Sequence, residues 1–91
     1  MARKIIITDT FRKCVARCKK SGYDLELLKE AIRTLAKGKK LPDVYRPHKL
    51  PGKDEECWIC HLHVDWALIW QQTSKELTLL VTGSKAHTAL F

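Results

Sequence analysis

Residues 57–82, CWICHLHVDWALIWQQTSKELTLLVT, decide the fold, because they contain three runs of the kind that form β-strands. The runs cover residues 57–63, 66–72 and 76–82, and the polar residues 73–75 separate the last two. Strands joined by connections this short pair in opposite directions. We therefore expect the second half of the chain to form an antiparallel meander.

The first of these strands carries two histidines, and the alternation of side chains along a strand assigns them to a face. One face is expected to hold Cys57, Ile59, His61 and His63, and the other Trp58, Cys60 and Leu62. One histidine of the pair would then be available for chemistry and the other would be structural. Trp66 and Trp70 share a face of the next strand, and aromatic side chains in that setting belong to the core.

The first half of the chain predicts a strand followed by two helices. A β-branched run covers residues 4–7, and residues 8–10 (TDT) offer N-cap chemistry. Apolar residues recur at helical spacing over residues 11–20 and 25–35, with Ser21 and Gly22 between them and Gly38 at the end. Residues 39–53 contain all three prolines and predict an ordered connection that holds His48.

The order of these elements indicates an α+β fold. With 91 residues the chain makes a single domain over residues 1–91, with one modest core and no room for a separate cofactor domain. We expect the N-terminal strand and a two-helix hairpin to pack on a small antiparallel sheet, with the helices on one face.

The net charge of +7 favours a polyanionic partner such as RNA, DNA or an acidic protein. Residues 1–53 carry 15 Lys/Arg and 5 Asp/Glu, whereas residues 54–91 carry 2 and 5. The basic half is therefore the expected docking surface. Arg12 and Arg17 lie on the basic helix predicted over residues 11–20, and Arg46 and Lys49 flank His48. We expect these four residues to contact the polyanionic partner, through its phosphates where that partner is RNA.

The sequence predicts a cytoplasmic protein without membrane contact. No stretch reaches the ~18 apolar residues of a membrane span, and the N-terminal apolar run is too short for a secretory signal. Two of the four cysteines, Cys14 and Cys18, fall at helical spacing, so reduced thiols are expected rather than disulfides.

The four histidines, His48, His61, His63 and His87, all lie in the second half of the chain. An unperturbed imidazole has a pKa of ~6.5 and can both take and give a proton near neutral pH. Several imidazoles in a small basic protein suit acid–base chemistry on a phosphodiester. Cleavage of RNA by its own 2′-hydroxyl needs such groups and requires no metal.

Four segments in this order resemble the YafQ-like branch of the RelE/ParE toxin superfamily: GYDLELLKEAI, LPDVYRPHKLPGK, CHLHVDWALIW and the terminal TGS…HTALF. The resemblance covers nearly the whole chain. It implies a RelE-like fold and the toxin of a type II toxin–antitoxin system, a ribosome-dependent messenger RNA endonuclease without a cofactor. Its partners would be the ribosome with messenger RNA and a cognate antitoxin, through which alone the toxin would bind operator DNA.

The resemblance also assigns site residues. His48, His61 and His87 fall on the family's active-site histidine positions, Asp65 on its carboxylate and Phe91 on a C-terminal aromatic near the site. His61 is preferred to His63 because it stands four residues before Asp65.

Two departures from the family pattern bear on catalysis. Val81 stands where most relatives have an arginine, and Lys85 and Ala86 are inserted before His87. We expect Lys85 to supply the missing positive charge, with less directional control than an arginine. The second departure is that Trp58 and Ile59 stand where relatives tend to have charged residues. Full catalytic power is therefore in question.

Two alternatives remain open at this point. Cys57, Cys60, His61 and His63 have the ligand types of a zinc module, although a strand would direct Cys57 and Cys60 to opposite faces. The chain could also be a weak or inactive member that binds nucleic acid without cleaving it, or a gyrase-directed member of the superfamily. The histidine set argues against that second alternative, because a simple binder has no need to gather imidazoles beside a carboxylate.

Overall fold

The computed structural model describes residues 2–49 and 57–83 of the chain. The described elements follow in the order β1 (Lys4–Ile7), α1 (Asp9–Lys20), α2 (Leu25–Ala36), the 3₁₀ turn η1 (Asp43–Tyr45), β2 (His48–Lys49), β3 (Cys57–His63), β4 (Trp66–Gln72) and β5 (Glu76–Gly83). The three strands expected in the second half and the two helices expected in the first half are confirmed.

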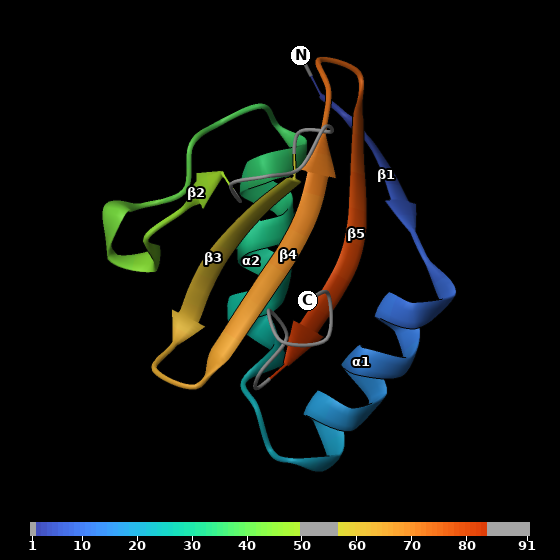
Figure 1. Ribbon diagram of the computed structural model, residues 1–91, viewed down its shortest axis with the longest axis vertical. Helices are drawn as coiled ribbons and strands as arrows, with labels where there is room; N and C mark the ends of the chain where they lie inside the picture. Colours follow the sequence, from blue (N-terminus) through green and yellow to red (C-terminus); the bar gives the residue numbers. More distant parts are fainter. Residues whose placement is uncertain (1, 50–56, 84–91) are drawn as a thin grey trace.

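The five strands form one sheet in the order β1-β5-β4-β3-β2 (Figure 1). Strands β2 to β5 pair antiparallel, which confirms the meander. β1 pairs parallel with β5, with Lys4 opposite Glu76 and Ile7 opposite Leu79, so the complete sheet is mixed. The chain passes through both helices between β1 and the other strands, and the fold is α+β as expected.

Both helices begin at a polar cap. The Thr8 hydroxyl accepts a hydrogen bond from the Phe11 N–H, and the Asp24 carboxylate accepts one from the Glu26 N–H. Thr8 also donates to the Leu79 carbonyl oxygen at 2.9 Å, which ties the start of α1 to β5. In Figure 1, α1 accordingly lies beside β5 and β1, and α2 lies behind the sheet. Neither helix is long and apolar enough to cross a membrane.

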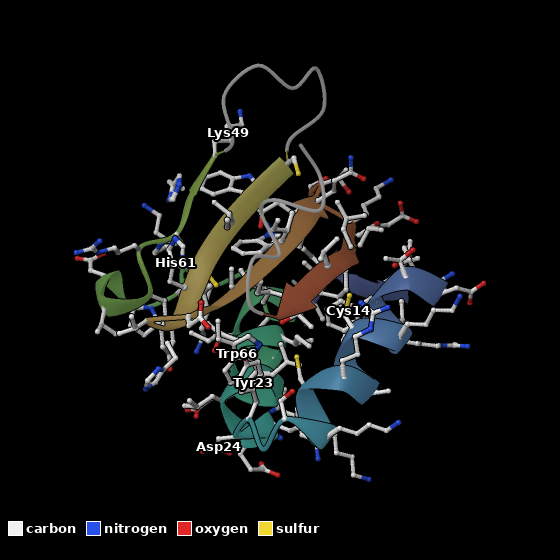
Figure 2. All side chains as sticks on the ribbon, turned by 60° about the horizontal axis from the view of Figure 1, so that its bottom comes forward. Cys14, Tyr23, Asp24, Lys49, His61 and Trp66 are labelled. Atoms are coloured by element: carbon white, nitrogen blue, oxygen red, sulfur yellow. The ribbon has the colours of Figure 1, made fainter. Side chains whose placement is uncertain are left out.

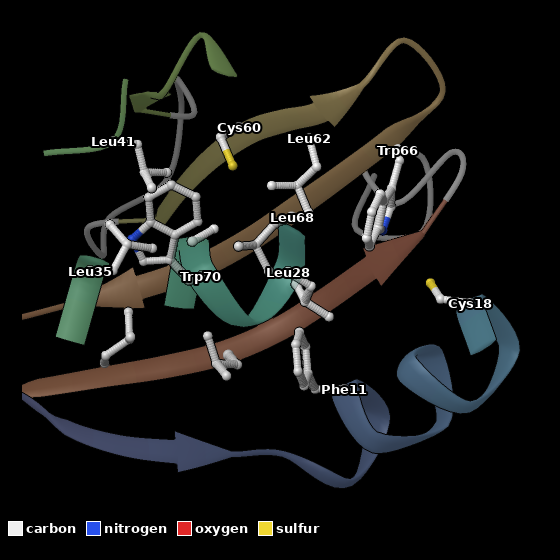
Figure 3. Close-up of a cluster of buried hydrophobic side chains, with 13 residues drawn as sticks. Phe11, Cys18, Leu28, Leu35, Leu41, Cys60, Leu62, Trp66, Leu68 and Trp70 are labelled. Carbon is white, nitrogen blue, oxygen red and sulfur yellow. The ribbon is translucent and has the colours of Figure 1, made fainter. Parts of the chain in front are cut away.

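The main core lies between the helices and one face of the sheet (Figure 3). The helices contribute Phe11, Cys18, Leu28, Ala31 and Leu35, and the sheet contributes Cys60, Leu62, Trp66, Leu68, Trp70, Leu77 and Leu79. Trp66 and Trp70 are buried in this cluster, as predicted. We call this side of the sheet the helix face and the other side the histidine face.

The histidine face carries a second buried cluster, formed by Cys14, Cys57, Ile59, Ala67, Ile69 and Val81. Val81 reaches this face because of a bulge in β5. Ile69 pairs with Val81 and Trp70 with Leu79, which leaves Leu80 without a partner in the ladder. The extra residue reverses the alternation, so Leu79 points to the helix face and Val81 to the histidine face.

Candidate active site

The segment 41–49 brings His48 to the edge of the sheet. After η1, Arg46 adopts a left-handed backbone conformation with φ 50° and ψ 52°, and the chain then enters β2. A non-glycine residue rarely adopts this conformation, because its Cβ crowds the following carbonyl oxygen. His48 thus lies in an edge strand paired with β3, which corrects the expectation of a connection without regular elements.

His48 and His61 lie next to each other on the histidine face. His48 pairs with Ile59, and His61 stands two residues further along β3, at the diagonal position where side chains on one face meet. The two imidazole ring centroids are 6.4 Å apart and the ring planes differ by 29°. His48 is exposed and His61 half-buried. Figure 2 places His61 on the side of β3 that faces the segment carrying His48.

A backbone contact sets the tautomer of His48. Its Nδ1 lies 2.8 Å from the Arg46 carbonyl oxygen. A carbonyl oxygen can only accept, so Nδ1 carries the proton and donates this hydrogen bond. In the neutral ring, Nε2 is therefore the acceptor. An exposed imidazole held in this tautomer can act as a general base through Nε2.

His63 lies away from this pair, which makes the prediction of a shared face wrong. Between His61 and His63 the register with β4 shifts, so His61 pairs with Ala67 and His63 with Trp66. Leu62 is the extra residue, and the bulge turns His63 to the side of Trp66. There His63 lines a cavity of about 340 Å³ together with Asp65 and Tyr23.

Asp65 therefore stands beside His63, at the turn between β3 and β4. The same cavity is lined by Gly22, Asp24 and Leu27 from the turn between the helices and the start of α2. Tyr23 packs on Trp66 with ring centroids 4.9 Å apart, and Figure 2 shows the two rings together. Tyr23 was not predicted from the sequence to be a site residue. The one sequence feature that marks its position is the preceding Gly22, which lies in a turn with a φ of 82°.

Hydrogen bonds fasten this end of the sheet. The Trp66 indole Nε1 donates to the Thr82 hydroxyl oxygen at 3.0 Å, and that hydroxyl donates to the Ala67 carbonyl oxygen at 2.9 Å. Thr82 is the one buried polar side chain among the described residues. It locks β5 to β4 beside Gly83, which pairs with Ala67, the partner of His61.

The position of Val81 gives no positive charge to the histidine face. Val81 is 6% exposed and packs in the second cluster, opposite Ile69. A cation does lie on α1 near the end of β5. Arg17 lines a cavity of about 230 Å³ together with Cys14, Thr82 and Gly83. The other expected RNA contacts, Arg12, Arg46 and Lys49, are all exposed.

The cysteines do not support the zinc module. Cys57 packs in the cluster on the histidine face and Cys60 in the cluster on the helix face. Burial raises the pKa of the Cys60 thiol to about 12, which opposes the thiolate form that zinc requires. Within the described ranges, no three His, Cys, Asp or Glu side chains gather in a way that could hold a metal ion. Lys85, His87 and Phe91 lie outside the described residues.

Comparisons with known proteins agree with this architecture. Residues 3–91 match the family model described as the bacterial toxin of a type II toxin–antitoxin system, YafQ. The chain is 33% identical over 90 residues to the mRNA interferase toxin YafQ of Escherichia coli strain K12, an alignment that covers 98% of this chain and 96% of that protein.

Two solved structures extend the similarity to three dimensions. The E. coli DinJ–YafQ toxin–antitoxin complex contains a chain that superposes with a TM-score of 0.88 at 33% identity, covering 100% of this chain and 99% of that one. A metal-bound toxin from Helicobacter pylori superposes with a TM-score of 0.86 at 33% identity, with both chains fully covered.

Proposed function

This chain belongs to the YafQ family of type II toxins, and we propose from this premise that it is an mRNA interferase, cleaving messenger RNA on the ribosome with histidine acid–base chemistry. The observation that carries the proposal is the pairing of His48 and His61, two imidazoles on one face with ring centroids 6.4 Å apart. The nucleophile is the ribose 2′-hydroxyl of the substrate.

In the proposed reaction, His48 Nε2 takes the proton of the 2′-hydroxyl while that oxygen bonds to the adjacent phosphorus. The bond from phosphorus to the 5′-oxygen then breaks, leaving a 2′,3′-cyclic phosphate and a 5′-hydroxyl. Protonated His61 gives its proton to the departing oxygen, and His87 is proposed as a further imidazole of the site. Each proton transfer of this kind contributes on the order of 10²- to 10⁴-fold to the rate.

The remaining site residues complete the proposal. Lys85, assisted by Arg17 beside Gly83, offsets the negative charge that develops on the phosphoryl oxygens. Asp65 occupies the family's carboxylate position, but it lies beside His63 and apart from the His48–His61 pair, so it moves no proton in this scheme. Phe91 stacks on a base. Arg12, Arg46 and Lys49 are exposed cations that hold the RNA backbone. A Lys85→Ala variant that cleaves as well as the parent would remove Lys85 from this scheme.

The partner that controls the toxin is a cognate antitoxin. The similar YafQ chain of E. coli was solved in a complex with DinJ. We place the protein in the cytoplasm with its ribosomal target, and operator DNA is reached only through the toxin–antitoxin complex.

The test is primer-extension mapping of messenger RNA on translating ribosomes, with the parent protein, a His87→Ala variant and free RNA as the control. The proposal predicts cuts in the ribosomal A site that the variant loses and that free RNA does not show. No cuts at any concentration would favour an inactive, nucleic-acid-binding or gyrase-directed member instead. A substrate with sulfur in place of the leaving 5′-oxygen then identifies the acid. A thiolate leaves without being protonated, so this substrate restores cleavage only in the variant that lacks the general acid.

A further inference from the structure

A third cavity lies on the helix face, on the opposite side of the sheet from the His48–His61 pair. It has a volume of about 490 Å³ and lies between the end of α2, the segment 41–47 and strands β3 and β4. Its lining includes Trp58, Trp70, Lys39, Lys40 and Arg3. We call it the tryptophan pocket. None of these residues takes part in the reaction proposed above.

One wall of the pocket is aromatic. Trp58 and Trp70 pair across β3 and β4, with ring centroids 6.4 Å apart and ring planes that differ by 15°. The indole N–H of Trp70 donates to the Gln72 side-chain oxygen at 2.9 Å. The indole Nε1 of Trp58 is buried and has no hydrogen-bond partner among the described residues. A buried donor of this kind is uncommon in native proteins and calls for an explanation.

The pocket is also basic. Arg3, Lys39 and Lys40 line it, against the single carboxylate of Asp43. The Arg3 guanidinium is fixed in place, because its Nε donates to the Thr73 carbonyl oxygen and its Nη1 to the Leu35 carbonyl oxygen, each at 2.7 Å. The one ion pair that joins two described residues is Lys29 with Glu26, so no described carboxylate pairs with Lys39 or Lys40. The ligand should therefore carry negative charge.

The pocket adjoins the active site around the edge of the sheet. His48 and Lys49 are consecutive in β2, and His48 pairs with Ile59 whereas Lys49 pairs with Trp58. Successive strand residues point to opposite faces. His48 thus belongs to the histidine face and Lys49 to the face of the pocket. Pro47, directly before His48, lines the pocket itself. A single RNA strand bound at His48 could therefore pass over this edge of the sheet and enter the pocket.

We propose that the tryptophan pocket binds one nucleotide of single-stranded RNA next to the cleaved site, with the base against Trp58 and a phosphate held by Lys39 and Lys40. Aromatic stacking with a basic groove is the usual way of holding single strands, and each stacked base is worth about tenfold or more in affinity. The inference rests on the proposed RNA substrate, but it concerns binding and does not depend on cleavage.

The test uses the indole N–H signals in a ¹H–¹⁵N NMR spectrum. The chain has three tryptophans, and the N–H groups of Trp66 and Trp70 have protein partners and serve as internal references. A Trp58→Phe variant assigns the third signal. The probe is a short oligoribonucleotide with 2′-O-methyl groups, which cannot be cleaved. Adenosine 5′-monophosphate and an acidic peptide of equal charge are added separately.

We expect the oligoribonucleotide to move the Trp58 signal more than the reference signals. The double variant Lys39→Glu, Lys40→Glu should weaken this binding by about tenfold or more, which is the scale of one well-held nucleotide. The matched double variant Lys29→Glu, Arg33→Glu reverses two exposed charges on α2, outside the pocket, and should weaken it much less.

Four results would overturn the proposal. The Trp58 signal could stay unchanged at saturating RNA, or the two double variants could weaken binding equally. Adenosine 5′-monophosphate binding as tightly as the RNA would make this a site for free nucleotides. A shift with the acidic peptide alone would make it a protein-binding surface. A protein that fails to cleave RNA can still pass this test, so failure of the pocket and failure of the proposed function remain distinguishable.

Discussion

His48 and His61 lie side by side on one face of the sheet, with ring centroids 6.4 Å apart, although they come from different strands. The pairing of β2 with β3 brings them together, and the Arg46 carbonyl oxygen holds the proton of His48 on Nδ1. The bulge after His61 keeps His63 out of the pair. One backbone turn and one register shift thus define which of the three described imidazoles lie together.

The left-handed conformation of Arg46 is predicted to position His48. Arg46→Gly keeps this backbone conformation at no steric cost, whereas Arg46→Val disfavours it by about 1–2 kcal/mol and displaces the carbonyl oxygen that His48 contacts. Both variants lose the same charge, so an effect that they share comes from the loss of the guanidinium group. We expect the valine variant to cleave more slowly than the glycine variant. The ¹⁵N chemical shifts of His48 should show a loss of the Nδ1–H tautomer in the valine variant only. Equal rates and equal shifts would contradict this role.

Thr82 is predicted to stabilise the end of the sheet through its hydroxyl. Thr82→Val has nearly the same size but leaves the buried Trp66 N–H and the Ala67 carbonyl oxygen without their partner. Unsatisfied groups of this kind cost about 1–3 kcal/mol each. Thr82→Ser keeps both hydrogen bonds and loses one methyl group, worth about 0.8 kcal/mol. Urea unfolding should rank the serine variant above the valine variant, and the reverse order would show that packing dominates.

Thr8 is predicted to act both as a helix cap and as a link to β5. Its hydroxyl accepts from the Phe11 N–H and donates to the Leu79 carbonyl oxygen. Thr8→Ala should lower the free energy of unfolding by about 1–2 kcal/mol, the upper part of the range for caps. Thr8→Ser retains the oxygen and should lose much less. If both variants unfold at the same urea concentration, the hydroxyl contributes nothing measurable.

Burial of Cys60 predicts a loss of stability at alkaline pH. The folded pKa is raised from the ordinary value of 9.0 to about 12, because the thiolate would lose its water. The unfolded chain therefore releases this proton from about pH 9, while the folded chain retains it. The contribution is present below pH 9 and falls by about 1.4 kcal/mol for each pH unit between the two pKa values. The check is the free energy of unfolding in urea at pH 8, 9.5 and 10.5, measured for the parent and for Cys60→Ala. The other groups titrate equally in both proteins, so the difference between the two free energies isolates Cys60. A constant difference between the two would contradict the prediction.

The strands and helices could be predicted because their signals are local. The turn at residues 73–75 fixes the pairing of β4 with β5, and helical spacing identifies α1 and α2. The parallel pairing of β1 with β5 joins residues about 70 positions apart and has no local signal. Strand β2 is only His48–Lys49, too short for any periodicity, and it depends on the left-handed turn at Arg46.

The candidate site was predictable to the extent that alternation holds along a strand. Alternation placed His61 on the same face as Ile59 correctly. It failed for His63 and would fail for Val81, because a bulge precedes each residue and reverses the faces beyond it. A bulge depends on the register of the neighbouring strand, which one sequence segment does not contain. The contact of Tyr23 with Trp66 likewise joins the turn between the helices to the start of β4, two segments distant in sequence.

The most direct test of the account is the rate of single-turnover cleavage of messenger RNA on ribosomes for His48→Ala, His61→Ala and His63→Ala. All three changes remove one imidazole from β2 or β3, but only the first two remove a member of the pair. We predict losses on the order of 10²- to 10⁴-fold for His48→Ala and His61→Ala, and near-parental rates for His63→Ala. Parental cleavage by the His48→Ala variant, or an equal loss in all three variants, would contradict the claim that this pair performs the chemistry.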